Sequence, residues 1–217
     1  MKLLLTSNGV SNRSIADALL ALVGKSFSDS ALVFVSTAAN VETGDKSWLI
    51  DNLVQFRNLG FGKTDIVDIA ALPKDRWMPR LEEADVIVFG GGNTSYLMDR
   101  IIRSGLKDSL PELLKSRVFV GISAGSVIAC ESIDKREAGS LYGEEIIGYD
   151  ADEGLGYFGS IIRPHLGSEG IGMDRMEDLS ERFNETFYAI DDQTAIVSDE
   201  GRIEVVSEGT WKKFERR

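Results

Sequence analysis

The segment Val118-Phe119-Val120-Gly121-Ile122-Ser123-Ala124-Gly125 decides the expected fold, because it joins an apolar run to a turn of small residues. The uncharged, partly β-branched run predicts a buried strand at residues 118–121. The last five residues fit the pattern G-x-S-x-G, in which a serine stands on a sharp turn between a strand and a helix. Residues 127–130 can begin that helix.

The small residues around Ser123 have a physical reason. The backbone of a serine on such a turn is strained, and Gly121, Ala124 and Gly125 leave the room that the turn requires. The hydroxyl then projects out of the sheet, where the first N–H groups of the following helix favour a developing oxyanion. We therefore expect Ser123 to be a nucleophile. The alternative is a Gly/Ser-rich turn that binds an anion or merely reverses the chain.

Short apolar runs alternate with amphipathic stretches along the rest of the chain. The apolar runs predict strands at residues 3–5, 31–35, 66–69 and 86–89, and also at 161–163. Helical spacing of apolar residues predicts helices at 12–23, 46–59, 94–104, 106–115 and 171–183. Continuous apolar strands separated by helices indicate a parallel sheet that is covered on both faces.

The pattern changes in the last third of the chain. Residues 139–163 are rich in glycine and predict turns, short strands or a mobile loop. Apolar runs at 196–197, 203–206 and 211–214 predict an antiparallel meander with Gly201 and Gly209 in its turns. We therefore expect an α/β fold: a mostly parallel sheet flanked by helices on both faces, with a small antiparallel C-terminal β meander, in a single domain over residues 1–217.

Composition excludes several classes of function. The chain has 217 residues, 43% of them hydrophobic, which suits one globular domain. Its net charge of −11 argues against a nucleic-acid partner. A single cysteine allows no internal disulfide and suits a reducing compartment. The apolar run at residues 3–5 is too short for a signal peptide, and no stretch approaches a membrane span of about 18 residues. We expect a cytoplasmic protein.

The run Gly90-Gly91-Gly92-Asn93 follows the predicted strand at 86–89. Carboxyl ends of parallel strands share one edge of a sheet, so this loop should lie near Ser123. The N–H groups of Gly91 and Ala124 could together form an oxyanion hole, and Asn93 could cap the next helix. A nucleotide-phosphate loop is the rival interpretation, but the G-x-G-x-x-G spacing and a Walker lysine are missing. The third interpretation is a turn with a purely structural role.

His165 is the only histidine, so a serine that needs an imidazole base has no other choice. Four acidic residues could hold the imidazole: Asp191 and Asp192 after it, or Glu144 and Glu145 before it. A turn between strands is the structural interpretation of the two aspartates. One histidine and one cysteine make a poor metal-ligand set, and we expect no metal and no cofactor.

At these residues the chain resembles the peptidase E family of serine peptidases, which includes the cyanophycinases. The similarity covers nearly the whole chain and rests on residues 90–94, 121–126, 163–165 and 190–195. It implies a fold like that of class I glutamine amidotransferases, Ser123 as nucleophile and His165 as base, with Gly91 and Ala124 as oxyanion donors. Asp192 stands where cyanophycinase-like members carry a glutamate. Other members carry an aspartate before the histidine, but this chain has none between Asp134 and Asp150.

The resemblance also implies a short peptide substrate. Family dipeptidases that require an N-terminal aspartate use an arginine after the histidine, where this chain has Gly172, with Arg175 nearby. We expect Asn93 and Arg175 to bind substrate, and the protein to be a monomer or homodimer. Two alternatives remain: an esterase, whose acid would precede a late histidine, and a non-catalytic module that binds a small anion or acidic peptide.

Overall fold

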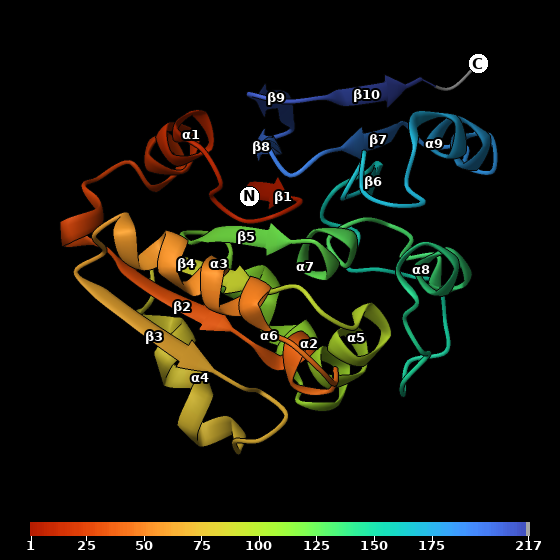
Figure 1. Cartoon of the computed structure of the whole chain (residues 1–217). Helices are drawn as coiled ribbons and strands as arrows, with labels where there is room; N and C mark the ends of the chain where they lie inside the picture. Colours follow the sequence, from red (N-terminus) through yellow and green to blue (C-terminus); the bar gives the residue numbers. More distant parts are fainter. Residues whose placement is uncertain (216–217) are drawn as a thin grey trace.

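The computed structural model describes residues 1–215, apart from the side chains of Glu137 and Ala138, and these residues form two sheets (Figure 1). Within them the larger sheet has seven strands in the order β3-β2-β4-β5-β1-β8-β9. The first five in this order are parallel, β8 is antiparallel to β1, and β9 is antiparallel to β8. The strands are β1 (Lys2–Thr6), β2 (Ala31–Val35), β3 (Lys63–Val67), β4 (Val86–Phe89), β5 (Val118–Ile122), β8 (Thr194–Asp199) and β9 (Arg202–Ser207).

Successive side chains of β1, β2, β4 and β5 enter two apolar clusters on opposite faces of the sheet. In β1, for example, Leu3 and Leu5 belong to one cluster and Leu4 to the other. Strands buried on both faces are apolar throughout, which explains the continuous runs in the sequence. The predicted α/β fold is confirmed. The first face is covered by α4 (Lys74–Glu83), α5 (Thr94–Arg103), α6 (Leu106–Leu113) and α7 (Ala124–Val127), and the second by α1 (Arg13–Val23) and α3 (Ser47–Asn58).

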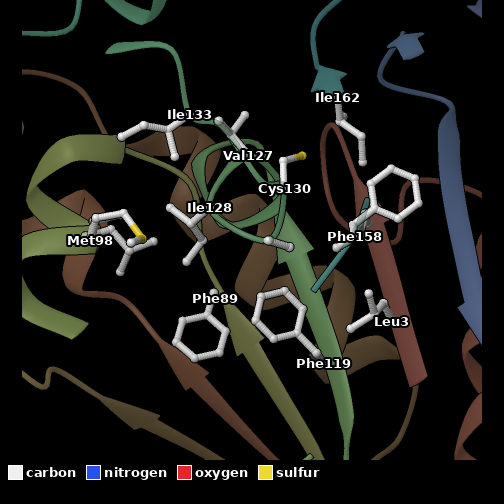
Figure 2. Close-up of a cluster of buried hydrophobic side chains, with 14 of the residues drawn as sticks. Leu3, Phe89, Met98, Phe119, Val127, Ile128, Cys130, Ile133, Phe158 and Ile162 are labelled. Atoms are coloured by element: carbon white, nitrogen blue, oxygen red, sulfur yellow. The ribbon is translucent and has the colours of Figure 1, made fainter. Parts of the chain in front are cut away.

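The core beneath α7 fixes the turn that begins at the end of β5. Figure 2 shows the rings of Phe89 and Phe119 side by side, with centroids 4.9 Å apart, Ile128 close to them, and Val127 farther along the same cluster. All four side chains are buried. Because such a core is close-packed, α7 has little freedom to shift relative to β4 and β5.

A second, three-stranded sheet has the order β10-β7-β6. Its strands are β6 (Ile161–Arg163), β7 (Phe187–Ile190) and β10 (Trp211–Phe214). β6 and β7 are parallel, and β10 is antiparallel to β7. The C-terminal segments are strands as predicted, but they divide between sheets: the β8–β9 hairpin extends the large sheet, and β10 leaves it to pair with β7. This long-range pairing has no signal in local sequence.

The remaining elements are short and lie mostly in connections: η1 (Phe27–Asp29), α2 (Thr37–Asn40), α8 (Lys135–Tyr142) and α9 (Met173–Ser180). The sequence analysis did not predict α4 or α8. Only Trp77 and Leu81 of α4 are buried, which leaves too weak a pattern to detect. α8 ends at Gly143, whose φ of 68° closes the helix. In residues 1–215, no helix is long and apolar enough to cross a membrane.

Candidate active site

Three neighbouring strands of the large sheet end at one edge and supply the centre of the site. β4, β5 and β1 are adjacent in the sheet and parallel. Gly91 lies two residues beyond β4, Ser123 directly follows β5, and Ser7 directly follows β1. The carboxyl edge of a parallel sheet is where ligands bind in open α/β folds.

The turn at Ser123 has the strained backbone that its sequence predicts. Ser123 has φ 49° and ψ −110°, in a region that residues with a Cβ rarely adopt. A Cβ on Gly121 would lie 2.6 Å from the Gly125 carbonyl oxygen, and one on Gly125 would lie 1.9 Å from that of Phe89. The hydroxyl of Ser126 donates to the Thr6 carbonyl at 2.7 Å and accepts the Thr6 N–H at 2.9 Å. The elbow is therefore fixed to β4 and β1.

The second sheet supplies the imidazole and a carboxylate in the same way. His165 follows β6 by two residues, and Asp192 follows the parallel neighbour β7 by two. Asp192 also precedes β8, which runs antiparallel to β1 and so begins at the edge where β1 ends. His165 Nε2 lies 2.9 Å from Ser123 Oγ, and His165 Nδ1 lies 2.8 Å from Asp192 Oδ1. The three side chains form one hydrogen-bonded chain.

Ser7 adds a contact that the sequence analysis missed. Its hydroxyl accepts the backbone N–H of His165 at 2.8 Å and donates to Asp192 Oδ1 at 2.5 Å. Ser7 is fully buried, so this hydroxyl is held in place. Hydrogen bonding from His165, and then from Ser7, lowers the pKa of Asp192 against the opposing effect of burial. In the sequence, the only feature that distinguishes Ser7 is its position directly after the first strand.

The other candidate acids lie apart from the imidazole. Asp191 accepts hydrogen bonds from Thr194 Oγ1 at 2.7 Å and from the N–H of Thr210 at 2.5 Å, so its carboxylate stabilises the turn into β8. Glu144 accepts from the N–H of Thr94 at 2.7 Å and from its hydroxyl at 3.0 Å, at the first turn of α5. Of the predicted acids, the structure brings Asp192 to His165.

A pocket of about 380 Å³ opens over Ser123 and His165. Its walls include Glu42, Trp48, Gly91, Tyr142 and Glu144. Tyr142 places its ring edge-on to the imidazole, with centroids 6.0 Å apart, and donates from its hydroxyl to the Pro164 carbonyl at 3.2 Å. Burial raises the pKa of this tyrosine above its usual range. Tyr142 therefore restricts the imidazole from the side of the pocket.

The two predicted oxyanion donors flank the nucleophile. Ala124 is the first residue of α7, so no helical carbonyl can accept its N–H. Gly91 lies on the other side, where an added Cβ would be 3.4 Å from the Cβ of Ser123. Both positions suit a donor that approaches an oxygen bound at Ser123.

The structure does not bring Asn93 or Arg175 to the pocket wall, contrary to the expectation that they bind substrate. Asn93 is 1% exposed, accepts the Tyr96 N–H at 2.9 Å as the cap of α5, and donates to the Glu145 carbonyl at 2.9 Å. Arg175 donates to Ser140 Oγ at 2.6 Å, on α8. The side chain of Asn93 therefore caps α5, and that of Arg175 holds α8.

Metal-ligating side chains do not gather at the site. Over the part of the chain that the structure describes, no group of three or more His, Cys, Asp or Glu side chains could hold a metal ion. The single cysteine, Cys130, is buried beneath α7, and burial raises its thiol pKa to about 12.

Solved structures share this fold. A candidate peptidase E protein from Listeria monocytogenes EGD-e superposes with a TM-score of 0.78 at 20% identity, covering 96% of this chain and 98% of that one. A peptidase from an acI-B1 Actinobacterium superposes with a TM-score of 0.65 at 18% identity, covering 99% and 94%. At these identities the likeness concerns the fold alone.

Sequence relatives and a family model extend the comparison. Peptidase E of Salmonella arizonae is 28% identical over 213 residues, which covers 96% of this chain and 88% of the relative. Peptidase E of Escherichia coli O6:K15:H31 is 26% identical over 212 residues, with the same coverage. The model of peptidase family S51 matches residues 3–206, a span that includes Ser7, Ser123, His165 and Asp192. The chain therefore belongs to peptidase family S51.

Proposed function

We propose that this protein is a serine peptidase that hydrolyses amide bonds of short peptides through an acyl-enzyme at Ser123. The observation that carries the proposal is the hydrogen-bonded chain from Ser123 through His165 to Asp192 at the floor of the pocket. Membership of a peptidase family supports it. The pocket volume of about 380 Å³ lies near the lower end of the range for small-molecule sites, which favours short substrates.

In this mechanism His165 Nε2 takes the hydroxyl proton as Ser123 Oγ attacks the carbonyl carbon. Asp192 accepts a hydrogen bond from Nδ1–H, which selects the tautomer with Nε2 unprotonated, and its negative charge stabilises the imidazolium. The N–H groups of Gly91 and Ala124 bind the oxyanion. His165 then gives its proton to the leaving amine as the C–N bond breaks. In the second half His165 Nε2 takes a proton from water, which attacks the acyl carbonyl, and returns that proton to Ser123 Oγ as the acid leaves.

The two alternative functions account for less of the structure. A binding module would not need a serine in a strained conformation that also hydrogen-bonds the only histidine. An esterase of the α/β-hydrolase type would carry its acid before the histidine. Here the carboxylate at the imidazole follows it in the chain.

The decisive experiment combines labelling with turnover. A fluorophosphonate probe should label Ser123, detected by peptide mass, and prior labelling should abolish hydrolysis of a dipeptide library. Labelling should fall sharply in His165→Gln, whereas Ser109→Ala, a change on α6 outside the pocket, should keep both labelling and turnover. Turnover without labelling of Ser123 would overturn the proposed mechanism, and labelling without any hydrolysis would overturn the proposed function.

A further inference from the structure

The pocket over Ser123 is lined by acidic and aromatic side chains. Glu42 comes from the loop after α2, and Glu144 follows α8. Trp48 and Tyr142 supply aromatic rings to the same walls. Among the lining residues, which all lie in the described part of the chain, there is no lysine or arginine. The pocket therefore combines two carboxylates with two rings, an environment that suits a cation.

Glu144 is held in place rather than free to turn outwards. The N–H and the hydroxyl of Thr94 each donate to one of its two carboxylate oxygens, at 2.7 and 3.0 Å. These donors belong to the first turn of α5, where the helix dipole also favours a negative charge. Two hydrogen bonds from one rigid element fix the direction of the carboxylate. A ligand in the pocket therefore meets a carboxyl group whose direction is already fixed.

Three basic side chains near the pocket, those of Lys135, Arg163 and Arg175, make contacts elsewhere. Lys135 donates to the carbonyl of Asp150 at 2.7 Å. Arg163 is 1% exposed, donates to the Ile162 carbonyl at 2.9 Å and stacks on the ring of Phe183. Arg175 is held by Ser140. None of these three cations lines the pocket, so no basic side chain of the pocket wall pairs with Glu42 or Glu144.

We propose that the pocket selects peptides whose acyl-side residue has a basic side chain, with Glu42 and Glu144 facing its cation, and that it disfavours acidic residues. The inference rests on the proposed peptidase function. A short peptide with a free amino terminus always brings one ammonium group, which can offset one carboxylate. The second carboxylate is matched only when the side chain is cationic as well. An aspartyl or glutamyl side chain would instead add a third negative charge.

Titration of Glu144 makes the preference for basic residues depend on pH. Burial, with the charge of Glu42 added, raises the pKa of Glu144 to about 7, against hydrogen bonds from Thr94 and the charge of Arg163. Its carboxylate is therefore largely protonated at pH 6 and ionised at pH 8. A bound cation favours the ionised form. The preference for basic residues should consequently grow as the pH rises through 7.

The test compares four dipeptides with the same leaving group: lysyl-alanine, methionyl-alanine, glutamyl-alanine and aspartyl-alanine. Their kcat/KM values are measured at pH 8 and low salt. We expect lysyl-alanine to exceed methionyl-alanine by about tenfold or more, and both to exceed the acidic dipeptides. Glu144→Gln and Glu42→Gln should each reduce the lysyl-to-methionyl ratio several-fold. Glu82→Gln is the matched control, because Glu82 is exposed before β4 while the pocket lies beyond its far end. That variant should keep the ratio.

The outcomes separate this inference from the function on which it rests. Equal rates for lysyl- and methionyl-alanine, or faster hydrolysis of aspartyl-alanine, would overturn the basic preference while leaving a serine peptidase. An unchanged ratio in both pocket variants would overturn the assignment to Glu42 and Glu144. If no dipeptide is hydrolysed and Ser123 is not labelled, the proposed function itself fails. Acetylating the amino termini distinguishes the α-ammonium group from the ammonium group of the lysine side chain. If the side chain determines the preference, lysyl peptides should remain the better substrates after acetylation. Loss of the preference would contradict the proposal.

Discussion

The hydroxyl of Ser7 donates a hydrogen bond to the carboxylate of Asp192, with 2.5 Å between Ser7 Oγ and Asp192 Oδ1. The same hydroxyl accepts the backbone N–H of His165. One buried side chain at the end of β1 therefore connects the backbone of the proposed base to the acid that orients it. Two sheets meet at this point, so Ser7 also fixes their relative position.

We predict that Ser7→Ala lowers kcat by about tenfold and changes KM little, because the geometry of Asp192 loosens while the pocket wall loses only one hydroxyl group. The chain has one histidine, so the Nδ1 proton of His165 can be observed by NMR without ambiguity. Its downfield resonance should broaden or shift in the variant. Ser11→Ala is the matched control, since Ser11 donates to the carbonyl and not to the carboxylate of Asp192. An unaltered resonance and kcat in Ser7→Ala would leave Ser7 with a structural role only.

The strain at Ser123 leads to a prediction about stability. Ser123→Gly should raise the free energy of unfolding by roughly 1 kcal/mol, because glycine adopts a φ of 49° without a Cβ clash. Ser123→Ala keeps the Cβ and should change stability much less. Both variants should lose hydrolysis by on the order of 10⁶ in kcat, as expected for a triad nucleophile. Urea unfolding measures the first effect and dipeptide turnover the second.

Two outcomes would contradict these expectations. Turnover of Ser123→Ala within tenfold of the unaltered protein removes Ser123 from the mechanism. Equal stability of the glycine and alanine variants means that the turn stores no strain.

The neighbouring aspartates should separate activity from stability. Asp192→Asn should lower kcat by about 10² to 10⁴, because an amide no longer selects the correct tautomer of His165. Asp191→Asn should keep kcat within tenfold and instead cost roughly 1 to 2 kcal/mol of unfolding free energy, since its carboxylate holds Thr194 and Thr210. Measuring both quantities for both variants makes each the control of the other. The reverse pattern would assign the orienting role to Asp191.

The sequence allowed the parallel part of the large sheet and most of the candidate site to be predicted, for identifiable reasons. Strands buried on both faces give unbroken apolar runs, and the turn at Ser123 needs small residues in fixed places. A single histidine leaves no choice of base. Ser7, in contrast, has no motif, because a serine after a strand is common. Its contacts with His165 and Asp192 span more than 150 residues, and only the folded chain brings them together.

Other features escaped because they depend on which polar group finds which partner. From the sequence Asn93 could cap a helix or bind substrate. In the structure its side chain accepts the Tyr96 N–H as a helix cap and donates to the Glu145 carbonyl. Likewise, the pocket side chains Glu42 and Glu144 come from loops about 100 residues apart. No local sequence pattern indicates that the carboxylates of Glu42 and Glu144 will line the same pocket.

The last prediction concerns Glu144 and the pH dependence of stability. Burial raises its pKa in the folded protein to about 7, from an ordinary value of 4.5. Between these two values the folded state binds a proton that the unfolded state has released, so the group lowers stability as the pH rises from about 5 to 7. Glutamine carries no charge to desolvate, and its amide oxygen can still accept the N–H of Thr94.

Glu144→Gln should therefore be nearly neutral at pH 5 and stabilising by roughly 1 kcal/mol at pH 8, a value discounted for the partial exposure of the side chain. Urea unfolding of both proteins at the two pH values measures this difference, and Glu82→Gln, which removes the same charge from the surface, should show no such dependence. A lysyl ligand reverses the sign: a non-hydrolysed lysyl peptide should stabilise the unaltered protein more than the variant at pH 8, because only a carboxylate gains from the cation. If Glu144→Gln destabilises the protein equally at pH 5 and pH 8, the carboxylate only caps α5, and its ionised form carries no burial cost that a bound cation could offset.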